Sequence, residues 1–129
     1  MVTNKWIKGG DITDALHIRK VVFVDEQKCP IDIERDEHDL DATHLVLYAD
    51  EIAVGCGRIV DMGDYFKLGR IAVLKSERGN HYGDMIVRLL LFKSFNAGAK
   101  EVRIGAQLHV VDFYKKFGFE AYGDVYICL

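Results

Sequence analysis

The chain has 129 residues, of which 50% are hydrophobic and 29% charged, and its formal net charge at pH 7 is −3. This length fits one domain with a core of its own, and the apolar content excludes an intrinsically disordered chain. The slightly acidic balance argues against a nucleic-acid partner, and no apolar run approaches the roughly 20 residues that span a bilayer.

The cysteines and the first residues indicate a compartment. Three cysteines without C-x-x-C spacing argue against a disulfide framework and against a zinc ribbon. The first residues lack the apolar stretch of a signal peptide. We therefore expect a cytoplasmic protein without a membrane partner, in which residues 1–129 form a single domain.

The first part of the chain predicts a strand followed by a helix. Residues 2–8 favour a short strand, which Gly9 and Gly10 end. Asp11 is a candidate N-cap for a helix that ends before Pro30, although the run 21–24 also suits a strand. One face of this helix should carry Ile12, Leu16, Arg19, Phe23 and Glu26.

Residues 32–41, DIERDEHDLD, concentrate the acidity of the chain, so that bases outnumber acids elsewhere. Charge runs are most often solvated, and we interpret this one as an acidic surface loop. It could also attract a cationic amine, while the rest of the chain could accept an anionic ligand. His38 and His44 lack the spacing of a known metal site, so we expect no metal.

The second part of the chain predicts a meander and then a β-α-β unit. The expected elements are strands at 43–49, 52–62, 65–74, 100–107 and 119–129 and helices at 85–97 and 110–117. The strands at 65–74 and 100–107 should run parallel. The order β-α-β-β-β-α-β-α-β predicts an α/β fold in which helices cover both faces of a mixed sheet.

The segment 75–83 joins a strand to a helix and is the most informative loop. The free N–H groups and the positive dipole end of a helix N-terminus make an anion site. Gly79 and Gly83 would let the backbone approach that anion, and Arg78 adds charge. Neither the Walker spacing nor the dinucleotide G-x-G-x-x-G fits.

Three segments resemble the GNAT family of acyl-coenzyme A dependent N-acetyltransferases. RGNHYG at 78–83 is similar to the family's Q/R-x-x-G-x-G/A loop, and FYKKFGF at 113–119 to its F-Y-x-x-x-G-F helix. FVDEQ at 23–27 resembles the FxxEQ signature of one bacterial branch, which also shows patterns like Asp41-Ala42-Thr43-His44 and Gly57-Arg58. His81 departs from the family by standing where the first loop glycine is usual.

This resemblance implies a GNAT fold with a splayed central sheet, in which acetyl-coenzyme A lies between strands 65–74 and 100–107. The pantetheine would pair with the backbone of 71–73 like an added strand, and the pyrophosphate would lie on 78–83. The implied cofactor-binding residues are Ile71, Ala72, Val73, Arg78, Gly79, Asn80, His81, Tyr82, Gly83, His109, Tyr114 and Lys116.

The implied reaction is direct attack of a primary amine on the thioester in a ternary complex. Tyr114 matches the family's general acid, although core packing would also explain it. Glu26 is the candidate base, with His44 and His109 as alternatives. A structural ion pair with an arginine would equally explain Glu26, and an amine of modest pKa needs no dedicated base.

The acceptor would lie in the cleft beside the splay. Its candidate ligands are Phe23, Glu26, Gln27, Arg58, Arg70 and Gln107. If Gly63-Asp64 forms a strict two-residue turn, Arg58 and Arg70 should face opposite sides of the sheet. A buried arginine there would suit an acceptor carboxylate or phosphate.

The sequence thus predicts an N-acetyltransferase that acts on a small-molecule or peptide amine. A non-catalytic acyl-coenzyme A binding or interaction domain of the same fold is the alternative. The branch usually continues beyond the strand at 119–129, so a final strand segment could be lacking here. Because the apolar run 125–129 would leave an uncovered edge, we expect a homodimer.

Overall fold

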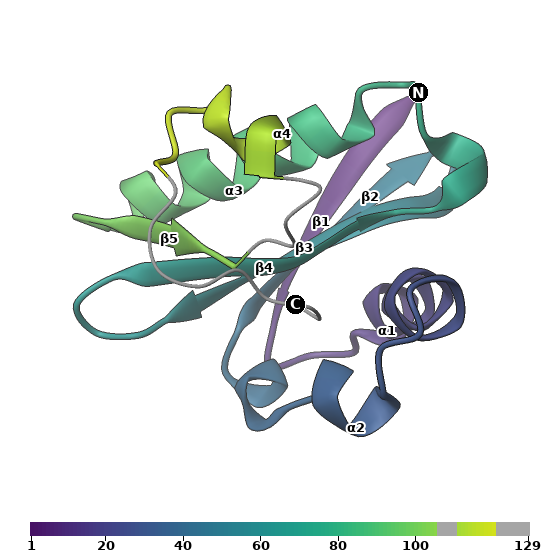
Figure 1. Ribbon diagram of the computed structural model, residues 1–129, viewed down its shortest axis with the longest axis horizontal. Coiled ribbons are helices and arrows are strands. Elements are labelled where there is room, and N and C mark those ends of the chain that lie inside the picture. Colours follow the sequence, from purple (N-terminus) through teal and green to yellow (C-terminus); the bar gives the residue numbers. More distant parts are fainter. Residues whose placement is uncertain (106–110, 121–129) are drawn as a thin grey trace.

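The computed structural model describes residues 1–105 and 111–120 (Figure 1). The elements are β1 (Val2–Lys8), α1 (Thr13–Arg19), the π-helix η1 (Lys20–Glu26), α2 (Ile31–Glu34), the 3-10 helix η2 (Glu37–Leu40), β2 (Thr43–Ala49), β3 (Ile52–Asp61), β4 (Phe66–Val73), the 3-10 helix η3 (Lys75–Glu77), α3 (Tyr82–Asn96), β5 (Val102–Ile104) and α4 (Val111–Lys115). Most of the predicted strand at 119–129 lies outside the described residues.

The strands form one mixed sheet in the order β1-β2-β3-β4-β5. β1 to β4 are antiparallel neighbours, and β5 runs parallel to β4. This arrangement confirms the predicted α/β fold, with a meander followed by a β-α-β crossover. The crossover helix α3 begins at Tyr82 rather than at 85, so its first turn grows directly out of the loop after η3.

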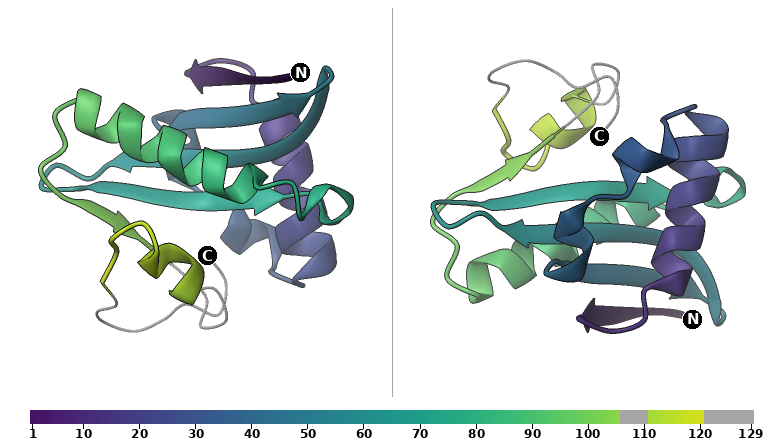
Figure 2. Two further views of the ribbon diagram at one scale, coloured as in Figure 1. Left: turned by 90° about the horizontal axis from the view of Figure 1, so that it is seen from above. Right: turned by 90° about the horizontal axis from the view of Figure 1, so that it is seen from below.

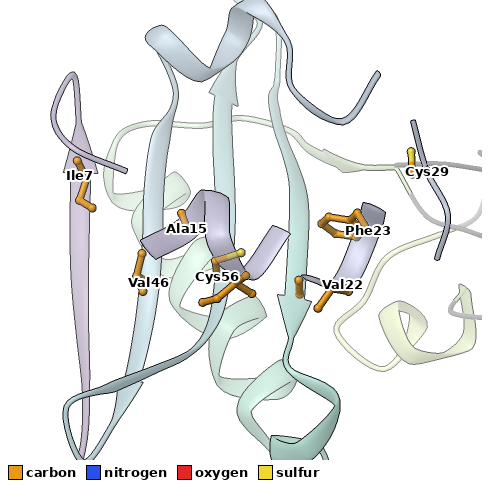
Figure 3. Packing of buried hydrophobic residues seen from close by; sticks show 9 residues of the cluster. Ile7, Ala15, Val22, Phe23, Cys29, Val46 and Cys56 are labelled. Atoms are coloured by element: carbon orange, nitrogen blue, oxygen red, sulfur yellow. The ribbon is translucent and has the colours of Figure 1, made fainter. Parts of the chain in front are cut away.

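Helices cover both faces of the sheet (Figure 2). α1, η1 and α2 lie on one face, where Ile7, Ala15, Val22, Phe23 and Cys56 belong to a buried cluster (Figure 3). α3 lies on the other face, where its side chains pack on the sheet. A Cβ atom at Gly57 would come within 2.8 Å of a Leu90 methyl carbon, so glycine there lets α3 approach the sheet closely.

The first helix differs from the prediction in its start and in its buried face. It begins at Thr13, and the Asp11 carboxylate accepts the Thr13 N–H at 2.9 Å although the N-cap position is Ile12. From Lys20 onward the helix is π-helical, as in the bond from the Gln27 N–H to the Val22 carbonyl at 3.0 Å. The wider turn changes the 3.6-residue spacing, and Glu26 is exposed instead of sharing the buried face.

The acidic stretch is not a solvated loop, contrary to the interpretation of its charge. It folds into α2 and η2, and Glu34 within it is 1% exposed. Arginines from the first helix and from two strands neutralise its carboxylates, as the next subsection details.

The prediction that Arg58 and Arg70 face opposite sides is also wrong. The turn at 62–65 is tight, since the Met62 N–H donates to the Tyr65 carbonyl at 2.9 Å. Arg58 pairs with Gly69, as a two-residue turn at 63–64 predicts. The register then shifts between Cys56 and Arg58, and Arg70 has a positive φ of 52°. This bulge turns the Arg70 side chain onto the Arg58 face.

β4 is longer than its described pairing with β5. The register pairs end at Leu68 with Ile104, whereas β4 continues to Val73. The residues that would continue β5 beyond Gly105 lie outside the described ranges, so the splay that the resemblance implied stays a prediction. None of the helices within the described ranges is long and apolar enough to cross a membrane.

Candidate active site

The loop that follows β4 presents backbone donors at the start of α3. Asn80 shapes it by donating from its side-chain nitrogen to the Glu77 carbonyl at 3.0 Å, and Gly79 adopts a φ of +92°. The first N–H groups of any α-helix have no partner within the helix. At α3 these groups belong to Tyr82 and the residues that follow it, so positive partial charge collects at this end.

His81 occupies the N-cap position of α3 in the left-handed conformation, with φ 63° and ψ 21°. Glycine adopts this conformation without strain, and the family usually has glycine at this place. The backbone of His81 thus keeps the path that a glycine would give the loop. His81 therefore differs from a glycine at this position by its imidazole side chain and not by its backbone conformation.

Arg78 and Glu26, two predicted site residues, form an ion pair. The two guanidinium Nη atoms donate to the two Glu26 carboxylate oxygens, each at 2.8 Å, and Arg78 Nε donates to the Val73 carbonyl at 3.1 Å. The hydrogen bond from Arg78 lowers the pKa of Glu26. The pair joins the end of η1 to the end of β4, and it leaves Glu26 a carboxylate at neutral pH.

Tyr114 lies on α4 and is buried, with 6% of its surface exposed. Burial raises its pKa to about 12, so the phenol keeps its proton at neutral pH. Its ring meets the Phe113 ring edge-on, with the centroids 5.1 Å apart. α4 in turn is anchored to α3 by an ion pair between Lys116 and Asp84.

Arg58 and Arg70 lie side by side but are bound to the acidic segment. Arg58 Nη1 donates to Asp36 at 2.8 Å and to Asp39 at 3.0 Å. Arg70 Nε donates to the Glu34 carbonyl at 2.9 Å and to its carboxylate at 3.1 Å. These contacts hold α2 and η2 over β3 and β4.

Arg19 completes this network from the first helix and is 1% exposed. Its Nε donates to the Glu34 carboxylate at 2.7 Å, and its Nη1 to Asp39 at 2.8 Å. Burial alone would raise the pKa of Asp39, but the hydrogen bonds and charges of Arg19 and Arg58 lower it to about 2. The sequence reasoning missed these carboxylates, although the acidic run that contains them was visible.

The other predicted residues divide by location. Phe23 is buried in the cluster under η1, and Gln27 is exposed just after Glu26. His44 is buried, its Nε2 lies 3.0 Å from the Asp39 carbonyl oxygen, and burial lowers its pKa. This places His44 in the arginine–carboxylate network, away from the loop at α3. Gln107 and His109 lie outside the described residues.

No group of His, Cys, Asp and Glu side chains within 1–105 and 111–120 is arranged to hold a metal ion.

The chain matches the family model described as the acetyltransferase (GNAT) family over residues 12–119. YjcF of Bacillus subtilis, an uncharacterised N-acetyltransferase, is 38% identical over 88% of this chain and 81% of its own length.

Solved structures agree with that match. The crystal structure of Escherichia coli ElaA superposes with a TM-score of 0.87 at 28% identity, covering 98% of this chain and 92% of that one. An acyl-CoA N-acyltransferase from Pseudomonas aeruginosa gives a TM-score of 0.86 at 27% identity, covering 98% and 91% of the two chains.

Proposed function

The chain belongs to the GNAT acetyltransferase family, and from this membership we propose that it transfers an acetyl group from acetyl-coenzyme A to a primary amine. The observation that carries the proposal is one continuous backbone path. It runs from the second half of β4, through the loop after η3, to the N-terminus of α3. Such a path offers a strand partner at one end and anion donors at the other.

The residues of this path fit the cosubstrate. A Cβ atom at Gly79 would meet nothing within 4 Å, so the loop is open on the side where a pyrophosphate would approach. The left-handed backbone of His81 keeps the turn that the family's glycine makes. Arg78 stands beside the loop with a guanidinium that can turn from Glu26 to a phosphate.

Acetyl-coenzyme A supplies an acetyl group activated as a thioester. In the balanced transfer a C–N bond forms, the C–S bond breaks, and one proton passes from the amine side to the sulfur side. Tyr114 is the proposed donor of the proton at sulfur, because its phenol is protonated at neutral pH. The chain otherwise works by holding the two reactants together.

Glu26 is the proposed acceptor of the amine proton. It is a carboxylate at neutral pH, and it is the exposed last residue of the π-helix η1. While Arg78 holds it, its basicity is reduced. Movement of Arg78 to the pyrophosphate would release Glu26 when the cosubstrate arrives.

The acceptor is proposed to be a small molecule or peptide carrying a primary amine, in the cytoplasm. A homodimer remains part of the proposal, but the run 125–129 on which it rests lies outside the described residues. The second candidate function is a non-catalytic acyl-coenzyme A binding domain. Two features favour it: the side chain of His81 in the loop, and the ion pair with Arg78 that engages the Glu26 carboxylate.

Release of free thiol from acetyl-coenzyme A over a panel of amines separates the two functions. Acetyl-coenzyme A should raise the melting temperature under either, since it binds only the folded chain. Amine-dependent thiol release is expected only for the enzyme. Arg78→Ala should weaken binding about tenfold or more through loss of a charge-assisted contact, with Arg35→Ala as the exposed control. Unchanged binding in Arg78→Ala would contradict the loop assignment.

A further inference from the structure

A small hollow lies on the α1 face of the sheet, over the first half of β4 and beside Gly105 at the end of β5. It has a volume of about 30 Å³ and is lined by Arg58, Val60, Lys67, Leu68, Gly69, Arg70 and Gly105. One water needs roughly 10–15 Å³ on this measure, so the hollow can take a group of two or three heavy atoms. A carboxylate has this size, and a phosphate could place two of its oxygens there.

The floor of the hollow is Gly69. A Cβ atom built there meets nothing within 4 Å, so the space above the strand is open at this residue. Gly69 pairs with Arg58 across the two strands, and Lys67 pairs with Val60. Since alternate residues of a strand share a face, Arg58 and Lys67 both flank the space above Gly69.

Every charged side chain that lines the hollow is a cation. Arg58 and Lys67 face it by strand alternation, and the bulge turns Arg70 onto the same face. The carboxylates that neutralise the arginines belong to α2 and η2 and are not among the lining residues. The charged side chains of the lining are thus all hydrogen-bond donors, which is what an oxyanion requires.

Arg58, one of the lining residues, carries a buried donor that finds no acceptor among residues 1–105 and 111–120. Arg58 is 5% exposed, and its Nε finds no hydrogen-bond partner within the described part of the chain, although Nη1 and Nη2 reach Asp36. A buried N–H without a partner is destabilising, and native structures rarely leave one so. Burial also lowers the pKa of Arg70, and the charges of Arg58 and Arg19 lower it further, while those of Glu34 and Asp36 oppose the shift.

We propose that this hollow binds an anionic group of the acceptor, a carboxylate or a phosphate, so that the substrate is an amine that also carries an oxyanion. The inference rests on the proposed acetyl transfer and names its substrate class. Gly69 lies two to four residues before the segment 71–73, which is roughly 7–13 Å along a strand. The amine and the oxyanion are therefore separated by several bonds.

The test compares anionic amines with neutral partners of the same length. The pairs are β-alanine, γ-aminobutyrate and ε-aminocaproate, each against its carboxamide, and O-phosphoethanolamine against ethanolamine. Thiol release at constant ionic strength gives kcat/KM for each. We expect at least one anionic member to exceed its partner about tenfold or more, the scale of one charge-assisted contact. The carboxylate and phosphate arms identify which oxyanion is bound.

Two variants change the hollow and keep the three arginines and three carboxylates of the network in the sequence. Gly69→Val should fill the space, and Lys67→Gln should remove one cation. In both, the preference for the anionic amine should fall toward one. Lys8→Gln, an exposed lysine on β1 at the other edge of the sheet, is the matched control and should retain the preference. Thermal melting verifies that each variant folds.

The outcomes separate this inference from the proposed function. Equal use of both members of every pair, or a preference that survives Gly69→Val, overturns the anion site while acetyl transfer stands. If no amine releases thiol, the deciding measurement is the melting temperature of the coenzyme A complex with each amine added. Greater stabilisation by O-phosphoethanolamine than by ethanolamine, lost in Gly69→Val, supports the hollow as an anion site even though transfer fails. Equal stabilisation overturns it.

Discussion

At the residue scale, His81 shows how one position can keep a backbone path while changing a side chain. The left-handed conformation costs an L-residue about 1–2 kcal/mol, and glycine avoids that cost. Glycine also loses more backbone conformational entropy on folding, which offsets about 0.4–1 kcal/mol of the advantage of avoiding the strain. The His81 conformation is therefore only mildly unfavourable relative to glycine.

We expect His81→Gly to leave the free energy of unfolding within about 1 kcal/mol of the wild type. His81→Val should lower it by about 1–3 kcal/mol, since a β-branched residue is strained at a φ of 63°. Denaturant unfolding of the three proteins measures both changes. Equal stability of the glycine and valine variants would show that the left-handed conformation is not retained in solution.

Tyr114 is the second residue at which a conservative change is informative. Tyr114→Phe keeps the ring and its edge-on contact with Phe113 but removes the proton donor. Turnover should fall by about 10²–10⁴-fold, the range for a general acid, while the melting temperature changes little.

Tyr65→Phe is the control for Tyr114, because it removes the same hydroxyl from a tyrosine in the turn between β3 and β4, whose ring lies against Arg103 of β5. It should retain full turnover. If Tyr114→Phe were as active as this control, Tyr114 would serve only to pack α4.

At the scale of elements, the arginine–carboxylate network attaches α2 and η2 to the sheet. Its stability depends on carboxylates that stay ionised, and the pKa of Asp39 is lowered to about 2 from an ordinary value near 4. For Asp36, burial opposes the shift, but the hydrogen bond and charge of Arg58 still lower the pKa. A lowered folded-state pKa contributes stability above the unfolded-state value, and this is lost as the pH falls toward the folded-state value.

The free energy of unfolding should therefore decline between about pH 4 and about pH 2, with Asp39 contributing about 2 kcal/mol of the loss. In Asp39→Asn this part of the pH dependence should disappear, while Glu37→Gln, an exposed acid of η2, should keep it. Unfolding by denaturant across this pH range gives both curves. Parallel curves for the wild type and Asp39→Asn would mean that the ion pairs do not form in solution.

The same network explains where sequence reasoning failed. β1 and β2 have their predicted boundaries, since each is a run flanked by glycines or turn residues. The acidic run was misread because its neutralising arginines come from 15 to 36 positions away in the chain. A local charge count cannot include partners that only tertiary packing brings near.

The places of the candidate-site motifs in the fold were predictable to the extent that the motifs are local. The loop and the tyrosine lie on contiguous segments, and the structure places them at the start of α3 and on α4. The face of Arg70 was not predictable, since the bulge arises inside β4 and leaves the tight turn before it unchanged. The hollow beside Gly69 depends on that bulge and could not be anticipated either.

At the scale of the whole molecule, the predicted splay would divide the sheet unequally. Among the described residues β5 is the last strand of the sheet and meets β4 through the pairs from Phe66 to Leu68, whereas β1 to β4 form a continuous meander. α4 is attached to α3 through contacts such as Phe113 with Gly83 and Lys116 with Asp84. A cosubstrate bound in the splay would contact both parts, so local opening of β5 would release it.

Linkage then predicts where hydrogen exchange slows. With acetyl-coenzyme A at about 100 times its Kd, any opening that releases the ligand is suppressed by up to about 100-fold. Amides of β5 and α4 should slow by this factor, while fraying of β1 at the opposite edge, which does not release ligand, should be unchanged. Exchange measured with and without acetyl-coenzyme A, peptide by peptide, gives the comparison. Protection confined to the loop before α3 would mean that the pyrophosphate binds but that the splay does not hold the pantetheine.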